Sequence, residues 1–448
     1  MYRNKFHIQA KKGLVNDPNG LIFWNNEYHV FFQLNPKSCE HTFKHWAHIK
    51  SKDLVNWEEL PIALAPTDWF DKDGCYSGSA IEKDGKLYLI YTGNVKNNGI
   101  RESYQCLAVS EDGVNFEKLG PVIHDKNIPK GYTRHFRDPK VFRKDGKFYL
   151  VLGAQRENLT GTILLYSSED LFNWTFEKEL IKNDFGYMCE CPDYYSVDNQ
   201  GVLAFSPQGL EAQGILYNNR YQSGYILRDK EEIEKNTFIE FDRGFEFYAP
   251  QSFEGKDNER IMFGWVGMPE ELEHPSVEEG WIHCLTLPRV ITVKDNKLFQ
   301  NPHKNLMGLR KDEKILSDLK VQGSLNLKDF EISGKTFELI ISLKDVKSDF
   351  ALKVRSGEKN NTLLKYDYEN KIFLFDRENS GRGYKGTRKC KLEKLEKIHI
   401  FSDSSCLEIY LNGGEEVFTG NIYPEENDDN IILDGLNIDI SNLEFYNI

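Results

Sequence analysis

Four carboxylic acids stand where turns that contain proline run into apolar stretches of the chain. They are Asp17 in the segment NDPNG, Asp138 in FRDPKVF, and Glu190 and Asp193 in ECPD. A polar turn followed by an apolar run is typical of the start of a β-strand. Each acid alone fits a solvated turn. However, Asp17, Asp138 and Glu190 recur at intervals of 121 (138 − 17) and 52 (190 − 138) residues, which indicates equivalent places in repeated units.

Acids of this kind could cleave a glycosidic bond if the fold brings them together. Carboxyl groups in one narrow opening repel each other and lose hydration, and both effects move their pKa values apart. Such a pair supplies one ionised nucleophile and one protonated acid, which are the two groups that a glycosidase uses. We therefore expect Asp17, Asp138 and Glu190 to meet, with Asp17 as a fixed nucleophile.

Sequence repeats predict the scaffold that would bring the acids together. The motif SKDLVNW at 51–57 returns as SEDGVNF at 110–116 and as SEDLFNW at 168–174, at intervals of 59 (110 − 51) and 58 (168 − 110) residues. The segments at 83–91 and 144–152 place Asp-Gly between apolar runs, which is the strongest short signal for a β-hairpin. Units of roughly 50 to 60 residues with four short strands describe propeller blades, with a solenoid as the alternative.

The number of predicted blades and a later change in the spacing of the predicted strands define the predicted domains. Five blades open near Asn19, Ser77, Asp138, Asp193 and Tyr248. The first strand of each blade lines the channel of a propeller, so residues at these strand starts should converge at one mouth. We predict an all-β protein with a five-bladed β-propeller over 1–301, a linker over 302–317 and a β-sandwich over 318–448. The sandwich shows no convergent acids, so we assign it to scaffolding or to contacts in an oligomer.

Composition narrows the function classes. The chain has 448 residues and is 40% apolar and 28% charged, which is typical of a globular protein. Its net charge of −13 argues against a surface that binds nucleic acid. Residues 1–10 lack the apolar core of a signal peptide, and no run is long enough to span a bilayer. We expect a cytoplasmic protein with no membrane partner. The eight Cys form no CxxC pair, so we expect reduced thiols, no metal and no cofactor.

Amides and aromatic side chains should gather at the same mouth as the acids. Those that the strand starts and neighbouring strands would place there are Gln33, Trp46, Tyr76, Ser77, Arg137 and Tyr248. Arg137 can donate two parallel hydrogen bonds, and Trp46 offers a stacking face. For Trp46 and Tyr248 packing in the core is the alternative. Acids, amides and aromatic rings together favour a sugar site over a metal or phosphate site.

The motifs in combination resemble glycoside hydrolase family 32, the invertase and β-fructofuranosidase family. The matching segments cover nearly the whole chain and include NDPNG, FFQLNP, HWAHIKSKDLVNWEELPIAL, SGSA, FRDPKVF, ECPD, FYAPQSF, LTLPR and IHIFSDSSCLEIYLNGG. The resemblance implies a five-bladed propeller with an appended β-sandwich. It implies Asp17 as nucleophile, Glu190 as general acid/base, and Asp138 as the residue that holds fructosyl hydroxyls and stabilises the transition state. Positions that match the fructosyl pocket are Asn16, Gln33, Trp46, Ser77, Arg137 and Tyr248.

Two departures from the family pattern lie beside the predicted site. Val15 stands where Met is more usual, and Ala47 stands where Gly is common. Both bear on substrate choice more than on the chemistry.

Several activities fit this resemblance. The first is a retaining hydrolase that releases fructose from sucrose or sucrose 6-phosphate. The others are a fructosyltransferase, a fructan hydrolase and a non-catalytic sugar-binding propeller, and the intact trio of acids argues against the last. An intracellular enzyme would meet a small imported disaccharide, so we expect sucrose 6-phosphate, with sucrose also cleaved. A phosphate at the rim would need cations, and His41, Lys44 and His45 are the candidates, although solvated loop charges are the alternative.

Overall fold

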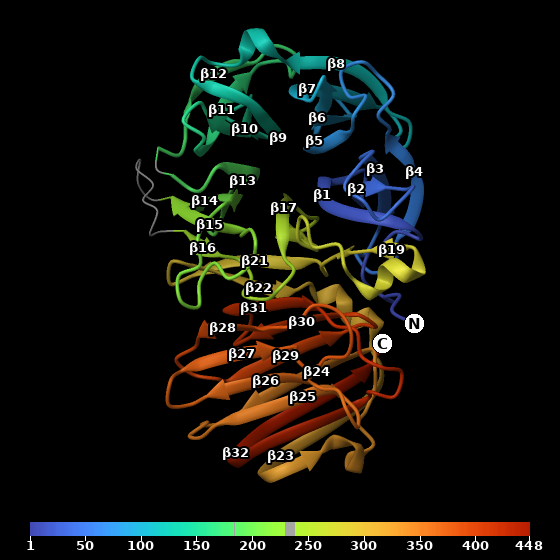
Figure 1. Ribbon diagram of the computed structural model, residues 1–448, viewed down its shortest axis with the longest axis vertical. Helices are drawn as coiled ribbons and strands as arrows, with labels where there is room; N and C mark the ends of the chain where they lie inside the picture. Colours follow the sequence, from blue (N-terminus) through green and yellow to red (C-terminus); the bar gives the residue numbers. More distant parts are fainter. Residues whose placement is uncertain (183, 229–237) are drawn as a thin grey trace.

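Two β domains lie end to end along the long axis of the molecule (Figure 1). The computed structural model describes residues 1–182, 184–228 and 238–448. The N-terminal domain has five blades around a channel, and the C-terminal domain is one strongly curved ten-stranded sheet. This arrangement confirms the predicted all-β propeller followed by a sandwich-like domain. None of the helices in the described ranges is long and apolar enough to cross a membrane.

The five blades follow one another in sequence. Blade one contains β1 (Gly13–Trp24), β2 (Glu27–Asn35), β3 (His45–Ser51) and β4 (Glu58–Leu64), and blade two contains β5 (Cys75–Lys83), β6 (Lys86–Asn97), β7 (Ile100–Ser110) and β8 (Glu117–Ile123). Blade three contains β9 (Tyr132–Lys144), β10 (Lys147–Arg156), β11 (Gly161–Ser168) and β12 (Thr175–Glu179). Blade four contains β13 (Met188–Val197), β14 (Gln200–Gln208), β15 (Gly224–Arg228) and β16 (Ile239–Glu240). Blade five contains β17 (Tyr248–Glu254), β18 (Arg260–Val266), β21 (Arg289–Lys294) and β22 (Lys297–Pro302), with β20 (Cys284–Leu285) beside β18.

One short strand ties the end of the propeller back to its beginning. β19 (Trp281–Ile282) pairs in parallel with β1 through Gly13 and Leu14. A 3-10 turn, η3 (Pro275–Glu279), leads into it, and η1 (Asp125–Asn127) connects blades two and three. The fifth blade is therefore joined directly to the first.

The repeated sequence motifs form the turns of the blades. Asp84 and Gly85 both have positive φ, 53° and 77°, which is the two-residue turn that matches the twist of a hairpin. The Ser-x-Asp motifs close the link between the third and fourth strands of a blade. Ser110 Oγ accepts the N–H of Gly113, while Asp112 accepts the N–H groups of Val114 and Asn115. Those two backbone hydrogen bonds hold the pKa of Asp112 well below its usual value.

The sandwich domain begins earlier than the sequence indicated. Its strands are β23 (Lys311–Asn326), β24 (Phe337–Leu343), β25 (Phe350–Ser356), β26 (Thr362–Asp367), β27 (Ile372–Asp376), β28 (Thr387–Lys391), β29 (Lys397–Ser402), β30 (Cys406–Leu411), β31 (Glu416–Asn421) and β32 (Asn430–Asn447), with η5 (Leu327–Phe330) after β23. β23 pairs with β32 from Lys311 onward, so only the part of 302–317 around η4 (Lys304–Leu309) connects the domains. β23 is largely exposed, and its charged composition concealed a long edge strand.

A buried network of charges joins the two domains. Arg289, fully buried, donates to Asp242 Oδ2 at 3.0 Å and to Glu408 Oε2 at 2.6 Å. His7 lies between Asp403 and Glu408, 2.8 Å and 3.0 Å from their carboxylate oxygens. Because a buried charge without its partner is costly, these groups fix one relative position of propeller and sandwich.

Candidate active site

Breaks in the regular pairing of the innermost strands aim the predicted site residues into the channel. The register of β1 shifts between Val15 and Pro18, that of β13 between Glu190 and Asp193, and that of β17 between Tyr248 and Gln251. An extra residue at such a bulge turns a side chain away from the plain in-and-out alternation of a strand. Asp138 itself has a φ of 66°, in the left-handed region, and so leaves the alternation of β9. The turn chemistry seen in the sequence is therefore a set of bulges at one mouth.

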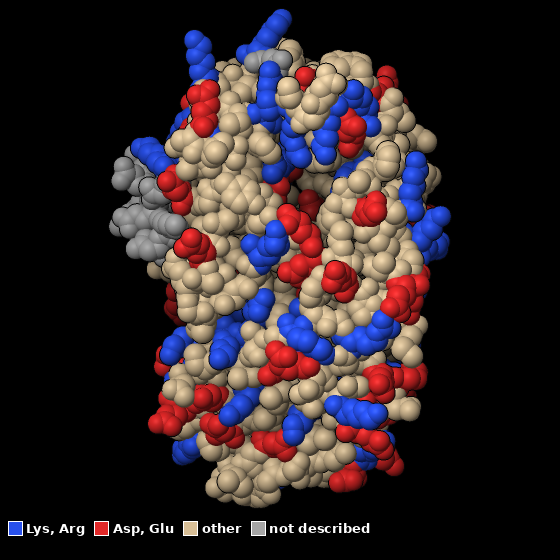
Figure 2. Space-filling view, viewed as in Figure 1, with Lys and Arg blue, Asp and Glu red and all other residues tan. Residues whose placement is uncertain are grey.

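These bulges bring nine of the ten predicted site residues to one cavity of about 330 Å³. The nine are Asn16, Asp17, Gln33, Tyr76, Ser77, Arg137, Asp138, Glu190 and Tyr248. The volume falls in the range of small-molecule sites, which is about 300–1,000 Å³. In the space-filling view the propeller is hollowed between its blades, and acidic side chains line the depth of the hollow (Figure 2).

Asp17 is held by a short relay of hydrogen bonds. Ser77 Oγ donates to Asp17 Oδ2 at 2.5 Å, and Gln33 Nε2 donates to Ser77 Oγ and lies 3.4 Å from the same carboxylate oxygen. Burial raises the pKa of Asp17, while the Ser77 hydrogen bond and the nearby Lys44 ammonium oppose that rise. One carboxylate oxygen of Asp17 is thus fixed in place, as a nucleophile requires.

Both oxygens of Glu190 are also engaged. Arg137 donates to Glu190 Oε1 from Nε at 3.0 Å and from Nη2 at 2.7 Å, and Tyr248 Oη donates to Oε2 at 2.7 Å. Arg137 is itself oriented by His135, whose Nδ1 lies 3.2 Å from Arg137 Nη1. Glu190 is therefore a carboxyl group with a fixed orientation beside a permanent positive charge and a hydroxyl group.

Asp138 is buried among charged groups that perturb its titration. Burial raises the pKa of Asp138 to about 7, with Arg137 opposing the rise and Glu190 and Asp17 adding to it. The backbone N–H of Cys191 donates to Asp138 Oδ2 at 3.0 Å, and the N–H of Asp138 donates to Thr92 Oγ1 at 2.9 Å. The cavity therefore holds three carboxyl groups whose surroundings differ, which is the condition for dividing acid and nucleophile roles.

Trp46 is not part of the cavity wall. Its ring is fully buried, and its Nε1 donates to the carbonyl of Tyr76 at 3.0 Å. The ring packs against Phe31 and Tyr91, with centroids 6.0 and 6.1 Å away, in the core between blades one and two. The expectation that Trp46 stacks on a sugar was wrong, and the alternative of core packing holds, because its strand is buried on both faces.

The proposed phosphate ligands also lie elsewhere than expected. Lys44 is buried in the cavity, where its Nζ donates to Asn16 Oδ1 and lies 3.4 Å from His41 Nδ1. Burial lowers the pKa of Lys44 to about 7, opposed by Asp17, and burial lowers the pKa of His41 to about 3. His45 does not line the cavity, and its Nδ1 lies 2.6 Å from the carbonyl of Phe43. Lys44 and His41 therefore belong beside Asp17 and not to an outer rim.

Sequence reasoning missed a second set of residues that line the cavity. They are Arg101, His135, Tyr187, Gln208, Tyr221, Trp265, Pro269 and Glu270. Trp265 pairs directly with Tyr248 in the hairpin of β17 and β18, and this register was the signal that could have found it. The Arg101 guanidinium lies 5.6 Å from the centre of the Tyr76 ring. Trp265 lies in the cavity wall although its side chain is fully buried, and Arg101 adds a cation.

Metal ligation finds no support in the part of the chain that the structure describes. Within those residues no group of three or more His, Cys, Asp or Glu side chains is arranged to hold a metal ion. All eight cysteines are free thiols, and Cys191 Sγ lies 3.6 Å from Asp17 Oδ2. Burial raises the pKa of Cys191 well above its usual value, so this thiol is neutral beside the acids.

Comparisons with known proteins agree with this geometry. The chain matches the family described as "Glycosyl hydrolases family 32 N-terminal domain" over residues 7–302 and "Glycosyl hydrolases family 32 C terminal" over residues 305–446. It is 43% identical to the sucrose-6-phosphate hydrolase of Bacillus subtilis (strain 168) over 436 residues, which is 94% of this chain and 89% of that protein.

Two solved structures share the whole architecture. The sucrose-6-phosphate hydrolase of Lactobacillus gasseri has a TM-score of 0.91 and 32% identity, with 100% of this chain and 93% of that chain covered. A mutant GH32 beta-fructofuranosidase of Bombyx mori, solved in complex with sucrose, has a TM-score of 0.86 and 31% identity, with 99% and 93% of the two chains covered. Both are similar along nearly their full length, so the two domains and their order are shared.

Proposed function

Because this chain belongs to glycosyl hydrolases family 32, we propose that it is a retaining β-fructofuranosidase that hydrolyses sucrose 6-phosphate and, less efficiently, sucrose. One observation carries the proposal: three carboxyl groups from three different blades line a single cavity, each with different partners. A non-catalytic sugar-binding propeller has no need for several buried acids in one cavity, since each raises the cost of folding.

The proposed chemistry begins with Asp17. Its free carboxylate oxygen attacks the anomeric carbon of the fructosyl group while Ser77 holds the other oxygen at 2.5 Å. Glu190 gives a proton to the departing oxygen of the glucosyl group. In the second step Glu190 takes a proton from a water molecule whose oxygen attacks the anomeric carbon. The bond to Asp17 breaks, and fructose leaves with its original anomeric configuration. Between the two steps the fructosyl group is bound covalently to Asp17. This bond forms in the first step and breaks in the second.

The remaining cavity residues hold the sugar in place for these steps. Asp138 would accept hydrogen bonds from fructosyl hydroxyls, and its charge would stabilise the positive character that develops on the ring. Arg137 and Tyr248 keep the Glu190 carboxyl oriented through hydrogen bonds of 2.7 Å each. Tyr187, which is 42% exposed in the cavity wall, provides an aromatic face for the sugar. Asn16 and Lys44 form a polar wall next to Asp17.

We assign recognition of the glucosyl phosphate to Arg101. Its guanidinium lines the cavity over the Tyr76 ring, at the tip of the β6–β7 hairpin. Within the described ranges its side chain makes no hydrogen bond or ion pair, so its donors are available to an anion. Arg137, by contrast, is engaged by Glu190. The names of the relatives from Bacillus subtilis and Lactobacillus gasseri support a phosphorylated substrate.

The test compares kcat/KM for sucrose 6-phosphate and sucrose in the unmodified protein and in Arg101→Gln. A charge-assisted hydrogen bond contributes about 1.5–3 kcal/mol, so the substitution should lower kcat/KM for sucrose 6-phosphate at least about tenfold and leave that for sucrose unchanged. Lys96→Gln is the matched control, because Lys96 pairs with Arg101 in the same hairpin and does not line the cavity. Equal losses on both substrates would remove Arg101 from phosphate recognition. Fructosylated sugars as the main products would replace hydrolysis by transfer.

A further inference from the structure

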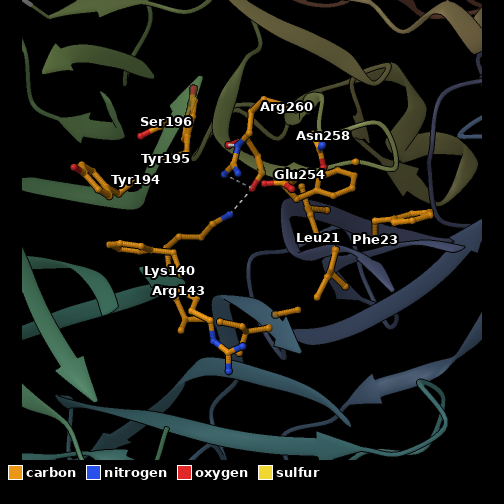
Figure 3. Close-up of a pocket in the computed structure, with 18 of the residues that line it drawn as sticks. Leu21, Phe23, Lys140, Arg143, Tyr194, Tyr195, Ser196, Glu254, Asn258 and Arg260 are labelled. Atoms are coloured by element: carbon orange, nitrogen blue, oxygen red, sulfur yellow. Dashed lines mark hydrogen bonds between the residues drawn. The ribbon is translucent and has the colours of Figure 1, made fainter. Parts of the chain in front are cut away.

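The channel of the propeller has a second cavity at its other end. It has a volume of about 750 Å³ and is lined by segments of all five innermost strands, β1, β5, β9, β13 and β17 (Figure 3). Those segments follow the catalytic ones along each strand. Val141 and Arg143 lie beyond Asp138, and Tyr194 lies beyond Glu190. This cavity is therefore the opposite mouth of the channel and is separate from the site of the three acids.

A buried ion cluster forms the floor between the two mouths. Lys140 Nζ donates to the carbonyl of Ser252 at 2.5 Å and to Gln251 Oε1 at 3.1 Å, and it lies 3.4 Å from Asp193 Oδ1. Arg260 reaches the same Ser252 carbonyl at 3.1 Å, so the two cations point to one oxygen (Figure 3). Lys140 and Arg260 thus balance the buried Asp193 carboxylate, and their charges are already used by the fold.

Further cations line this mouth without an ionic partner. They are Arg143, Lys144 and Lys256, and within the described part of the chain their side chains make no hydrogen bond or ion pair. The Arg143 guanidinium lies 4.7 Å from the centre of the Phe148 ring. The only carboxyl group in the described cavity wall is that of Glu254. The chain as a whole has 70 acidic and 57 basic residues, so an average patch would be slightly acidic. Solvated surface cations are the ordinary explanation for a single exposed cation, but here three line one concave site.

The same cavity offers aromatic surface. Tyr194, Tyr195 and Phe142 are part of its wall. Tyr195 is 5% exposed, and the Arg260 guanidinium lies 4.4 Å from the centre of its ring. Phe142 and Tyr194 are half-buried, so these two rings supply the aromatic surface that a ligand can reach.

We propose that the second mouth of the channel binds a small phosphorylated sugar. Its phosphate contacts Arg143 and Lys256, because a guanidinium and an ammonium group both suit phosphate oxygens. Its sugar ring lies against Tyr194 and Phe142, whose half-buried aromatic rings suit the apolar side of a sugar. The volume of about 750 Å³ leaves room for a sugar beyond the phosphate itself.

The test measures binding of glucose 6-phosphate by calorimetry, with inorganic phosphate and glucose as the comparison ligands and the unmodified protein as the starting point. Glucose 6-phosphate should bind, and glucose should not. The double variant Arg143→Gln with Lys256→Gln should weaken the binding at least about a hundredfold, since the loss of each charged contact alone weakens binding about tenfold or more. Its kcat/KM on sucrose should remain unchanged. Added salt should weaken the binding, because the contacts are ionic.

Two further variants make the result decisive. Lys359→Gln with Lys389→Gln removes the same charge from exposed positions of the sandwich domain and should leave binding intact. Arg143→Lys with Lys256→Arg keeps the charges and should keep the binding, which separates recognition from a folding defect. Binding that survives the first double variant but disappears in Arg101→Gln would place the phosphate in the catalytic cavity and overturn the proposal. Stronger binding of inorganic phosphate than of glucose 6-phosphate would also overturn it, because the aromatic wall would then contribute nothing.

Discussion

Removal of the Ser77 hydroxyl group should move the pH dependence of catalysis in one direction. Ser77 Oγ donates to Asp17 Oδ2 at 2.5 Å, and this hydrogen bond favours the ionised form of a carboxyl group whose pKa burial has raised. In Ser77→Ala the charged form of Asp17 loses that support, so the pKa of Asp17 should rise further. A nucleophile must be ionised to attack. The acid limb of kcat/KM should therefore move to higher pH.

The size of the effect follows from the kind of hydrogen bond. A hydrogen bond to a charged group contributes about 1.5–3 kcal/mol, and about 1.36 kcal/mol corresponds to one pH unit. The midpoint of the acid limb should thus move up by about one to two pH units. Gln33 lies 3.4 Å from the same oxygen and could approach it in the variant, which favours the lower end of the range. Well below the midpoint, kcat/KM should fall about ten- to a hundredfold.

The assay is the pH profile of kcat/KM for sucrose, measured for the unmodified protein, Ser77→Ala and Ser79→Ala. Ser79 lies on the same strand, where its Oγ donates to the carbonyl of Pro139 at 2.9 Å and touches none of the three acids. Ser79→Ala should therefore lower stability without moving the acid limb. An acid limb that stays in place in Ser77→Ala, or moves equally in both variants, would refute the role of Ser77 as the partner of an ionised Asp17.

Four other substitutions test the roles of single residues. Asp17→Asn should lower kcat by several orders of magnitude and abolish the trapping of a fructosyl-enzyme in rapid-quench experiments, because no nucleophile remains. Glu190→Gln should slow the cleavage of sucrose far more than that of a fructoside with an acidic phenol as leaving group, since such a phenol needs no proton. Burial raises the pKa of Asp138 to about 7, so the native protein loses stability as the pH rises through that value. The melting temperature of Asp138→Asn minus that of the unmodified protein should therefore increase between pH 4 and pH 8. A difference that stays constant over this range would contradict this. Arg289→Met should cost about 3–5 kcal/mol in urea unfolding by leaving Asp242 and Glu408 without their cation, whereas the exposed Arg382→Met should change stability by less than about 1 kcal/mol.

Most residues of the site could be predicted from turn motifs in the sequence. Asp17, Asp138 and Glu190 could be found because each stands one or two residues before a proline at an equivalent place in a blade, and the bulges that aim them use those same turns. The position of Trp46 could not be predicted in this way. Strand alternation assigns a side chain to one of two faces, but β3 is buried on both, so the pattern gave no direction.

The missed residues depended on contacts between distant segments. Trp265 reaches the cavity only through the register of β17 with β18, and Arg101 only through the length of the β6–β7 hairpin. No motif marks either residue, because a register is a property of two strands and of the turn between them. β23 was missed for another reason. It is an exposed edge strand whose charged side chains, such as Lys311 and Glu313, blunt the edge and hide its strand character.

The catalytic mouth and the floor of the channel depend on each other. Gln251 accepts from Lys140 Nζ at 3.1 Å and donates to the carbonyl of Cys191 at 3.0 Å, and the N–H of Cys191 donates to Asp138 Oδ2 at 3.0 Å. A chain of three hydrogen bonds therefore runs from the buried cation of the floor to Asp138. Burial raises the pKa of Asp138 and of Asp17, so the native protein tolerates two carboxyl groups that would be more easily ionised in water. Because the burial that raises these pKa values also surrounds both acids with fixed hydrogen-bond partners, the feature that perturbs the acids is also the one that positions them.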